Sequence, residues 1–500
     1  MRKKVIFEEI SPSEFFYRNR DLAGFTNPAR ALYSSIRELV ENSLDACDIA
    51  KIHPKIYVRL LTANGEDVTD KPQEYMITVR DNGIGIEGER IPFALGKVFY
   101  GSKFKLRQSR GMFGMGGTMS ILYGQITTHK PVKIVSSVDG RIKYTYEILI
   151  DIEKNRPIIL NFKREDAKGW RGTSITLYLL GDYYRSSGKI IEYFRKTAIV
   201  TPYADIAFID PYGRILTFKK ATDEIPEPPK EVDPHPKGVD VESLRRMIRA
   251  WKGGSLVKFL ERNFHRVGRK TALSFLEYAG IDPSKDPREL SNEEIVHLSK
   301  ALQSYDGFLP PDAKCLSPLG ENILTTGIIK ELKPEFYAIA IRGPSAYSGF
   351  PFIVEIGLAY GGGVERGLKL YRFANRIPLL YDEGSDVSWK ILNESIDWKH
   401  YKVSLDDPLT IIVHICSTKI PYKTVGKEYI ADRPEIEREI RNGVKEVLRK
   451  LSAYLSRKGS MEMAKRKLNI YARYLPLIAK FATELAGKRK EPDISVLLGG

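Results

Sequence analysis

The sequence predicts an α+β protein, with two regions that mix helices and antiparallel strands and a small helical module between them. Three observations indicate this. Over roughly the first 220 residues, helical segments stand beside strand-like runs that follow one another closely. The Pro-rich stretch at 224–240 has the composition of a linker, and residues 241–306 beyond it show only helical patterns. Sequential antiparallel strands beside helices are typical of an α+β sandwich and not of a doubly wound parallel sheet.

The expected elements follow in chain order. In the first region they are a helix at 32–50, strands at 55–61 and 75–80, a helix beginning near Thr118, a hairpin at 133–149, and strands at Pro157–Phe162 and Thr173–Leu179. The module has helical patterns at 242–251, 255–264, 269–280 and 291–305, with glycine in the turns. The second mixed region, 307–430, has strand-like runs at 335–343, 351–362 and 409–417. Amphipathic helical stretches at 435–458 and 463–490 follow Pro434.

Length and charge limit the class of protein. The chain has 500 residues, which at roughly 150 per domain predicts about three domains. With 42% hydrophobic and 28% charged residues, it is not disordered throughout, collagen-like or a disulfide scaffold. Lys and Arg number 79 against 63 Asp and Glu, a net charge of +16. This excess favours a polyanionic partner, which could be nucleic acid, an anionic membrane surface or a phosphorylated substrate.

Cysteine usage and hydropathy indicate the compartment. Cys47, Cys315 and Cys416 are far apart and form no CxxC motif, so neither disulfides nor a structural zinc site is expected. The N-terminal residues lack the apolar core of a signal peptide, and no run approaches the roughly 18 apolar residues of a membrane span. We therefore expect a soluble intracellular protein without membrane association.

The helix ALYSSIRELVENSLDACDIA carries the first candidate site. At about 100° per residue, Glu38, Asn42 and Asp45 fall within a sector of about 60°, opposite the apolar residues. A solvated polar face would explain this arrangement as well. Asn in mid-helix costs helix propensity, however, and a Glu and an Asn at i, i+4 can converge so that the amide oxygen binds Mg²⁺ while the carboxylate orients a water.

Two glycine-rich turns follow this helix. In MITVRDNGIGI a strand ends at Arg80, and the carboxylate of Asp81 could accept a hydrogen bond from an exocyclic amine, although an ordinary Asp-Asn-Gly turn has the same residues. In RGMFGMGGTMS four glycines precede a helix, so backbone N–H groups and a helix N-terminus can form an anion cradle. Glycines more often serve turns. Walker A, GxxxxGK[ST], is absent from the sequence, which excludes a P-loop site.

Taken together, ELVENSLDA, DNGIGI, RGMFGMGGTMS and GTSITLYL (172–179) resemble the four motifs of the Bergerat ATP-binding fold of the GHKL superfamily. The superfamily includes type II topoisomerases, Hsp90, MutL and histidine kinases. The resemblance implies that Glu38 is the general base, that Asn42 binds Mg²⁺ and that Asp81 contacts the adenine amine. The implied cofactors are ATP and Mg²⁺. The implied nucleotide-binding residues are Asn42, Asp81, Gly85, Ser102, Lys103, Gly111, Met112, Phe113, Gly114, Met115, Gly116, Gly117, Thr118 and Lys427.

Lys427 comes from a different part of the chain. Residues 307–430 resemble the transducer domain of topoisomerases and MutL, which sends a loop lysine to the γ-phosphate. Lys427 in IPYKTVGKEYIAD is the candidate for this catalytic role, with Lys423 as the second choice; a solvated loop lysine is the alternative for both.

A helical insert between a GHKL domain and a transducer is similar to the arrangement in the B subunits of topoisomerase VI. The resemblance implies an N-terminal dimerisation strap (1–20), a GHKL ATPase domain (21–228), a helix-two-turns-helix insert (229–306), a transducer (307–470) and a C-terminal helical tail (471–500). WKHY at Trp398–Tyr401 resembles a WKxY motif of that family, and its residues would also suit a surface loop or a DNA backbone.

The resemblance also implies partners. We find no convincing carboxylate cluster to accompany a nucleophilic tyrosine, so DNA cleavage is expected from a separate A subunit in an A2B2 heterotetramer. Its docking element would be the helix with Tyr471, Tyr474, Leu475, Leu477 and Ile478, unless this is a core helix. We further expect an ATP-dependent homodimer, an archaeal origin and a cytoplasmic, nucleoid-associated location. Candidate contacts to double-stranded DNA are Lys168, Arg171, Arg266, Arg269 and Lys270.

Rival functions make different predictions. An Hsp90-type chaperone would be acidic and much longer, and a MutL-like clamp would lack the insert. A sensor kinase would need a phosphoacceptor histidine helix before the ATPase domain. A DNA-binding scaffold without ATPase activity is disfavoured because Glu38 is present.

Overall fold

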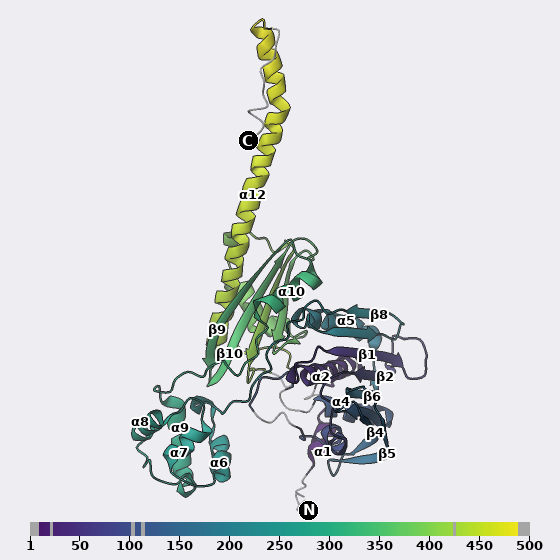
Figure 1. Cartoon of the computed structure of the whole chain (residues 1–500), viewed down its shortest axis with the longest axis vertical. Helices are drawn as coiled ribbons and strands as arrows, with labels where there is room; N and C mark the ends of the chain where they lie inside the picture. The colour runs from purple at the N-terminus through teal and green to yellow at the C-terminus, as the bar shows by residue number, and fades with distance from the viewer. Residues whose placement is uncertain (1–9, 21–23, 102–105, 112–115, 424–426, 489–500) are drawn as a thin grey trace, which may run out of the picture.

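A computed structural model describes residues 10–20, 24–101, 106–111, 116–423 and 427–488. Figure 1 shows two sheet-containing domains, a helical module beside them, and one long helix that projects from the second domain. The predicted α+β class is confirmed. Of the predicted strap, the described part contains α1 (Pro12–Arg18), which Ser11 caps by accepting a hydrogen bond from the N–H of Glu14.

The first domain is built on an eight-stranded sheet with the order β5-β4-β3-β6-β2-β1-β7-β8. All neighbouring strands are antiparallel except β1 and β7. The strands are β1 (Lys55–Thr62), β2 (Gln73–Arg80), β3 (Val132–Ser137), β4 (Ile142–Asp151), β5 (Arg156–Asp166), β6 (Gly172–Gly181), β7 (Asp205–Ile209) and β8 (Ile215–Phe218).

Helices cover one face of this sheet. They are α2 (Pro28–Ile49), α4 (Gly116–Thr128) and α5 (Tyr183–Val200), with η2 (Gly88–Arg90) and α3 (Ile91–Gly96) near β4 and β5. β1 and β2 bury alternate residues, because successive side chains of a strand point to opposite faces. α2 begins four residues before the predicted start, since Asn27 caps it and Pro28 occupies its first turn.

The insert has its own hydrophobic core and consists of short helices. They are η3 (Pro236–Gly238), α6 (Val241–Ala250), α7 (Leu256–Asn263), α8 (Arg269–Ala279), η4 (Pro287–Glu289) and α9 (Asn292–Ser304). Gly280 ends α8 with a φ of 66°, and Ser291 with Glu294 forms a capping box at the start of α9. The four predicted helices are thus confirmed.

The second domain has a five-stranded sheet with the order β12-β11-β13-β10-β9. Its strands are β9 (Phe336–Tyr347), β10 (Phe350–Tyr360), β11 (Leu368–Ala374), β12 (Ile377–Pro378) and β13 (Leu409–Ser417). Its helices are α10 (Gly320–Leu332), η5 (Glu383–Ser385), α11 (Val387–Glu394), η6 (Lys399–Tyr401) and α12 (Pro434–Leu485). β13 is buried along its whole length, which explains its uninterrupted apolar sequence.

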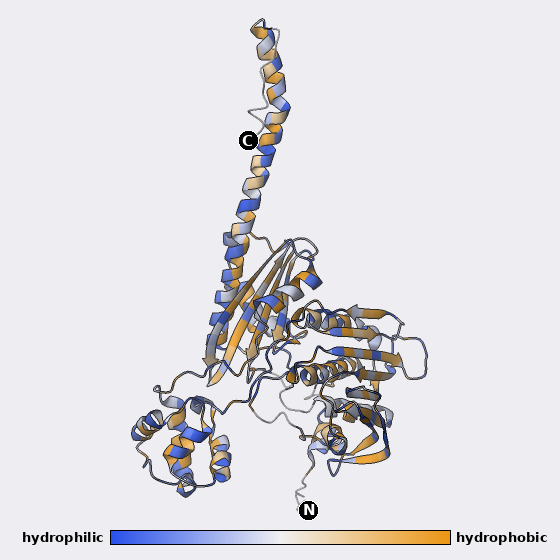
Figure 2. Ribbon diagram, in the orientation of Figure 1, coloured by the Kyte–Doolittle hydropathy of each residue, from blue (hydrophilic) through white to orange (hydrophobic). Residues whose placement is uncertain are grey.

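The two predicted C-terminal helical stretches form one continuous helix, α12, which packs its first half on β9 and β10. The prediction that the chain is helical from Pro434 onward is confirmed as far as Leu485. Gly459 and the preceding residues stay helical, and Pro476 lies inside the helix, which also runs through the predicted domain boundary at 470/471. Figure 2 shows apolar residues continuing along the part of α12 that projects beyond the sheet.

A hydrophobic cluster joins the two sheet domains. Tyr203 and the end of α5 pack against α10, and the same cluster includes Phe373 and Ile412 of the second sheet. Contact is close at Gly327, where an added Cβ would lie 1.8 Å from the carbonyl oxygen of Ile199. The end of α5 therefore lies against α10 and close to the second sheet.

Candidate nucleotide-binding site

A cavity of about 760 Å³ opens between α2, the turn after β2, the start of α4 and the loop before α12. All four sequence motifs and Lys427 meet in it, although Lys427 lies 389 residues from Glu38 in the chain. Its lining includes Glu38, Asn42, Asp81, Gly85, Gly111, Gly116, Gly117, Thr118, Thr173 and Lys427. This volume is in the range of sites that hold a drug-sized ligand.

Glu38 lies at the inner wall of the cavity and is 8% exposed. Its Oε1 accepts a hydrogen bond from Arg37 Nη2 at 2.9 Å and lies 3.4 Å from Lys427 Nζ. The carboxylate therefore lies between two cationic side chains and lines the cavity.

Lys427 reaches the cavity from the second domain and is buried. It has a left-handed φ of 57°, and its Nζ donates a hydrogen bond to the backbone carbonyl of Arg110 at 3.2 Å. The next residue, Glu428, forms an ion pair with Arg30 at the start of α2. Lys423 instead pairs with Asp432 at 3.1 Å and does not line the cavity. Lys427 is therefore the lysine that the fold brings to Glu38.

Glu41 is a buried carboxylate that the sequence analysis did not select. Arg37 Nε lies 3.5 Å from its Oε1 and Lys427 Nζ lies 3.8 Å from its Oε2. Among the described residues, neither oxygen has a hydrogen-bond partner. Desolvation raises the pKa of Glu41 to about 7, although the charges of Lys427 and Arg37 act in the opposite direction. Its position next to two motif residues on α2 was the only sequence signal for it.

Asp81 is fixed by three hydrogen bonds in the turn after β2. Its Oδ1 accepts from the N–H of Gly83 at 2.9 Å and of Thr173 at 3.0 Å, and its Oδ2 accepts from the hydroxyl of Ser43 at 2.9 Å. Burial raises the pKa of Asp81 in spite of these bonds. Nearby, Gly85 has a φ of 73° and lies so close to Ser137 that a Cβ would be 2.2 Å from its carbonyl oxygen. The backbone of the DNGIGI turn therefore depends on glycine here.

The start of α4 faces Glu38 and Asn42. A Cβ on Gly116 would lie 1.8 Å from Glu38 Oε2, and one on Gly117 would lie 3.1 Å from Asn42 Nδ2. Glycine thus lets the start of α4 approach the two α2 side chains. Of the other predicted nucleotide-binding residues, Gly111 and Thr118 line the cavity, whereas Ser102, Lys103, Met112, Phe113, Gly114 and Met115 lie outside the described residues.

Comparison with known proteins identifies the family of the chain. Residues 27–180 match the family of histidine kinase-, DNA gyrase B- and HSP90-like ATPases, and residues 311–467 match the transducer of the topoisomerase VI B subunit. The B subunit of type 2 DNA topoisomerase 6 from Metallosphaera sedula is 44% identical over 488 residues, which cover 96% of this chain and 90% of the relative. The corresponding protein of Sulfurisphaera tokodaii is 45% identical, covering 97% and 92%. The chain belongs to the family of topoisomerase VI B subunits.

Family membership confirms the predicted resemblance and distinguishes the chain from a MutL-like clamp. The similarity to topoisomerase VI B subunits extends over 492 residues, so it includes the helical insert that a MutL-like clamp would lack. Within the described residues, no helix has the length and apolar character needed to cross a membrane.

The five basic residues predicted to contact DNA differ in their exposure to solvent. Lys168, Arg266, Arg269 and Lys270 are exposed. Arg171 is partly buried, and its Nε donates to the backbone carbonyl of Gly83 at 3.1 Å, so it supports the DNGIGI turn.

In WKHY, Tyr401 is buried and Trp398 packs against the second core, with its Nε1 donating to the backbone carbonyl of Leu392 at 3.1 Å. Only Lys399 and His400 are exposed there. Aromatic stacking on DNA is therefore not available to Tyr401 in this conformation.

Proposed function

We propose that the chain is the ATP-binding and ATP-hydrolysing subunit of a type IIB topoisomerase, an isomerase that relaxes supercoiled DNA by passing one duplex through another. One observation carries the proposal. Lys427 of the transducer lies 3.4 Å from Glu38 of the ATPase motif inside one cavity, so the site joins the domain that binds nucleotide to the domain that moves. A nucleotide that contacts both domains can stabilise one relative orientation of them.

Each residue has a defined role in this proposal. Glu38 accepts a proton from the attacking water, and Lys427 contacts the γ-phosphate. The N–H groups at Gly116 and Gly117 hold phosphate oxygens, and Asp81 accepts a hydrogen bond from the adenine amine. Ser43 donates to the Asp81 oxygen Oδ2, which orients that carboxylate toward the base.

The donor set fits Mg²⁺. Asn42 offers an amide oxygen and Glu38 a carboxylate on one face of α2, and Mg²⁺ is usually held by few protein oxygens together with substrate phosphates. Asn42 would hold the ion, which would neutralise phosphate charge when bound.

The proposed partners are double-stranded DNA, an A subunit that cleaves it, and a second copy of the chain bound when ATP is present. The net charge of +16 supports DNA, and the exposed row on the projecting part of α12 supports docking of the A subunit. In that row Tyr471, Tyr474, Leu477 and Ile478 are 48–60% exposed, whereas Leu475 is partly buried. The A2B2 assembly, the 1–20 strap, the other predicted domain boundaries and a cytoplasmic, nucleoid-associated location in an archaeal cell belong to this proposal.

The test is supercoil relaxation by the full chain with an archaeal topoisomerase VI A subunit, alongside ATP hydrolysis. Wild type should relax DNA only when ATP and the A subunit are both present. Glu38→Gln should still bind ATP but hydrolyse it about 10²–10⁴-fold more slowly, which is the usual contribution of a general base. Glu192→Gln, a helical glutamate of the same domain outside the cavity, is the matched control and should turn over normally. Normal hydrolysis by Glu38→Gln would remove Glu38 from its role, and the absence of ATP-dependent relaxation by wild type would reject the function.

A further inference from the structure

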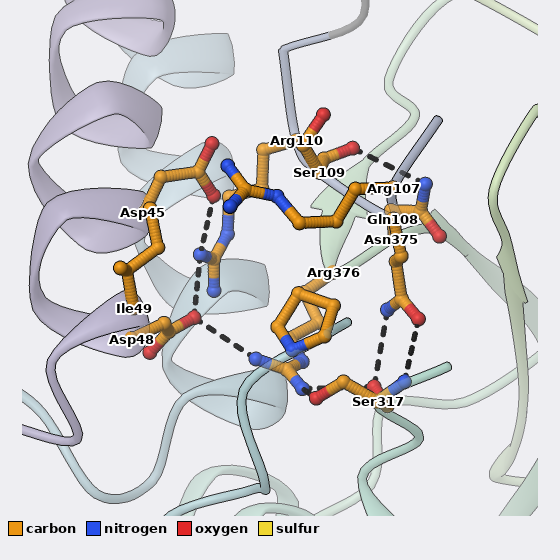
Figure 3. A pocket seen from close by; sticks show the side chains of 11 residues that line it. Asp45, Asp48, Ile49, Arg107, Gln108, Ser109, Arg110, Ser317, Asn375 and Arg376 are labelled. Carbon is orange, nitrogen blue, oxygen red and sulfur yellow. Dashed lines mark hydrogen bonds and ion pairs between the residues drawn. The ribbon is translucent and has the colours of Figure 1, made fainter. Parts of the chain in front are cut away.

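Four buried charged residues lie between the nucleotide site and the second sheet, and we call them the junction cluster (Figure 3). They are Asp45 and Asp48 of α2, Arg110 at the start of the glycine-rich motif, and Arg376 from the second domain. Each is no more than 8% exposed. With Gln108, Asn375 and other neighbours they line a cavity of about 30 Å³ beside the nucleotide cavity.

One carboxylate oxygen joins the two domains. Asp48 Oδ2 accepts a hydrogen bond from Arg110 Nη1 at 2.7 Å and another from Arg376 Nη1 at 2.9 Å. Arg110 Nη1 also donates to Asp45 Oδ1 at 3.0 Å, and the hydroxyl of Tyr203 donates to Asp48 Oδ1 at 3.1 Å. Figure 3 shows both guanidinium groups turned toward Asp48. Displacing the second domain would therefore take one cation away from a buried, shared carboxylate.

Arg110 also contacts Lys427. The backbone carbonyl of Arg110 accepts the hydrogen bond from Lys427 Nζ at 3.2 Å, while its guanidinium holds Asp48. Lys427 and Arg376, both from the second domain, are thus connected through the same residue of the first domain. These hydrogen bonds connect Arg376 through Asp48 and Arg110 to the carbonyl oxygen that accepts the bond from Lys427.

Arg376 is held in an unusual backbone conformation. Asn375 and Arg376 form the two-residue turn between the paired residues Ala374 and Ile377, with φ values of 49° and 68°. Turns of this kind favour glycine at the second position, because a side chain there is strained. An arginine at this position indicates that its side chain is needed.

The turn is anchored to the centre of the second sheet. The N–H of Arg376 donates to His414 Nε2 at 3.0 Å, and His414 Nδ1 donates to Glu355 Oε2 at 2.7 Å. Glu355 also accepts from the N–H groups of Leu319 and Gly320 at the start of α10. Both ring nitrogens of His414 are thus in hydrogen bonds, so the buried Glu355–His414 pair anchors the turn.

The side chains of Asn375 and Arg376 hold the segment before Arg110 against the second domain. Asn375 Nδ2 donates to the backbone carbonyl of Ser109, next to Arg110, at 3.2 Å. Arg376 Nη2 donates to the backbone carbonyl of Ser317 at 2.8 Å, and Gln108 Nε2 donates to the same carbonyl at 3.0 Å. Gln108, Ser109 and Arg110 of the first domain therefore each form a hydrogen bond with the second domain.

We propose that Arg376 is a second coupling residue, a positioning residue that acts with Lys427. Through Asp48 and Arg110 it fixes the second sheet relative to α2 and to the base of the glycine-rich motif, and so sets the position of Lys427 at the nucleotide. The inference rests on the proposed function, since it explains how ATP turnover is coupled to strand passage.

The experiment compares two buried arginines of the same hairpin in the full chain with the A subunit. Arg376→Gln removes the junction contact. Arg372→Gln is the matched control, because Arg372 is 1% exposed and its ion pair with Asp386 and its hydrogen bonds to Leu379 and Tyr381 all stay within the second domain. The measured quantity is the number of supercoils relaxed per ATP hydrolysed, which does not depend on the amount of folded protein.

We expect this ratio to fall at least tenfold for Arg376→Gln and to stay within twofold of wild type for Arg372→Gln. Arg376→Lys, which keeps the charge, should recover part of the ratio, and it also serves if the glutamine variant fails to fold. An unchanged ratio for the soluble Arg376 variants, or an equal fall for Arg372→Gln, would overturn the proposal. Failure of the proposed function is recognised separately, because wild type would then show no ATP-dependent relaxation.

Discussion

Gly116→Ala should damage hydrolysis without damaging the fold. An added Cβ at Gly116 would lie 1.8 Å from Oε2, 2.2 Å from Cδ and 2.6 Å from Cγ of Glu38. Ordinary contact needs about 3.5 Å, so the Glu38 carboxylate has to move by well over 1 Å. A misplacement of about 1 Å can cost roughly 10²-fold in rate, and complete loss of a general base about 10²–10⁴-fold. We therefore expect kcat for ATP hydrolysis to fall at least 100-fold.

The structure also predicts what should not change. The clash is with the end of a flexible side chain, and alanine in a helix is favoured over glycine by roughly 0.5–1 kcal/mol, so the thermal midpoint should be no lower than that of wild type. Gly188→Ala in α5 is the matched control, since a Cβ there meets no atom within 4 Å and should leave turnover unchanged. The assays are steady-state ATP hydrolysis and thermal unfolding. Hydrolysis by Gly116→Ala within threefold of wild type, in a folded protein, would refute the reasoning.

Two further predictions concern the buried carboxylate of Glu41 and the positive charge of Lys270. The pKa of Glu41 is raised from 4.5 to about 7 in the fold, so between these values the folded state binds more protons than the unfolded state. This contribution is fully present below pH 4.5 and lost as the pH rises through 7, by up to about 3 kcal/mol. Denaturant unfolding of Glu41→Gln should show less of this loss than wild type, and an identical pH profile would contradict the assignment. Separately, Lys270→Ala, at an exposed site on the insert, should weaken binding to duplexes of any sequence and reduce the slope of log K against log salt by about 1, whereas an unchanged slope would exclude Lys270 from the DNA contact.

The nucleotide motifs could be predicted from sequence because they are local. Glu38 and Asn42 share a helix face because of their spacing alone. The Asp-Asn-Gly sequence at Asp81 and the glycines before Thr118 indicate a turn and a loop without any tertiary contact. The helices and strands that periodicity predicted are confirmed for the same reason, whereas α5, α10 and β11 were not predicted. The helix predicted from Pro434 onward is confirmed, although Gly459 and Pro476 lie within it.

Contacts between distant residues were decided by tertiary structure. Lys427 was expected at the site only from a family resemblance, and its contact with the buried Glu41 was not predicted. The Asp48–Arg376 pair joins residues 328 apart, and no local pattern distinguishes either of them from a surface charge. The sequence by itself determined which chemistry the first domain carries, through short-range spacing. Only the packing of α5 on α10 and the parallel pairing of β11 with β13 place the β11–β12 turn against α2, because strand order and domain contact depend on the whole chain.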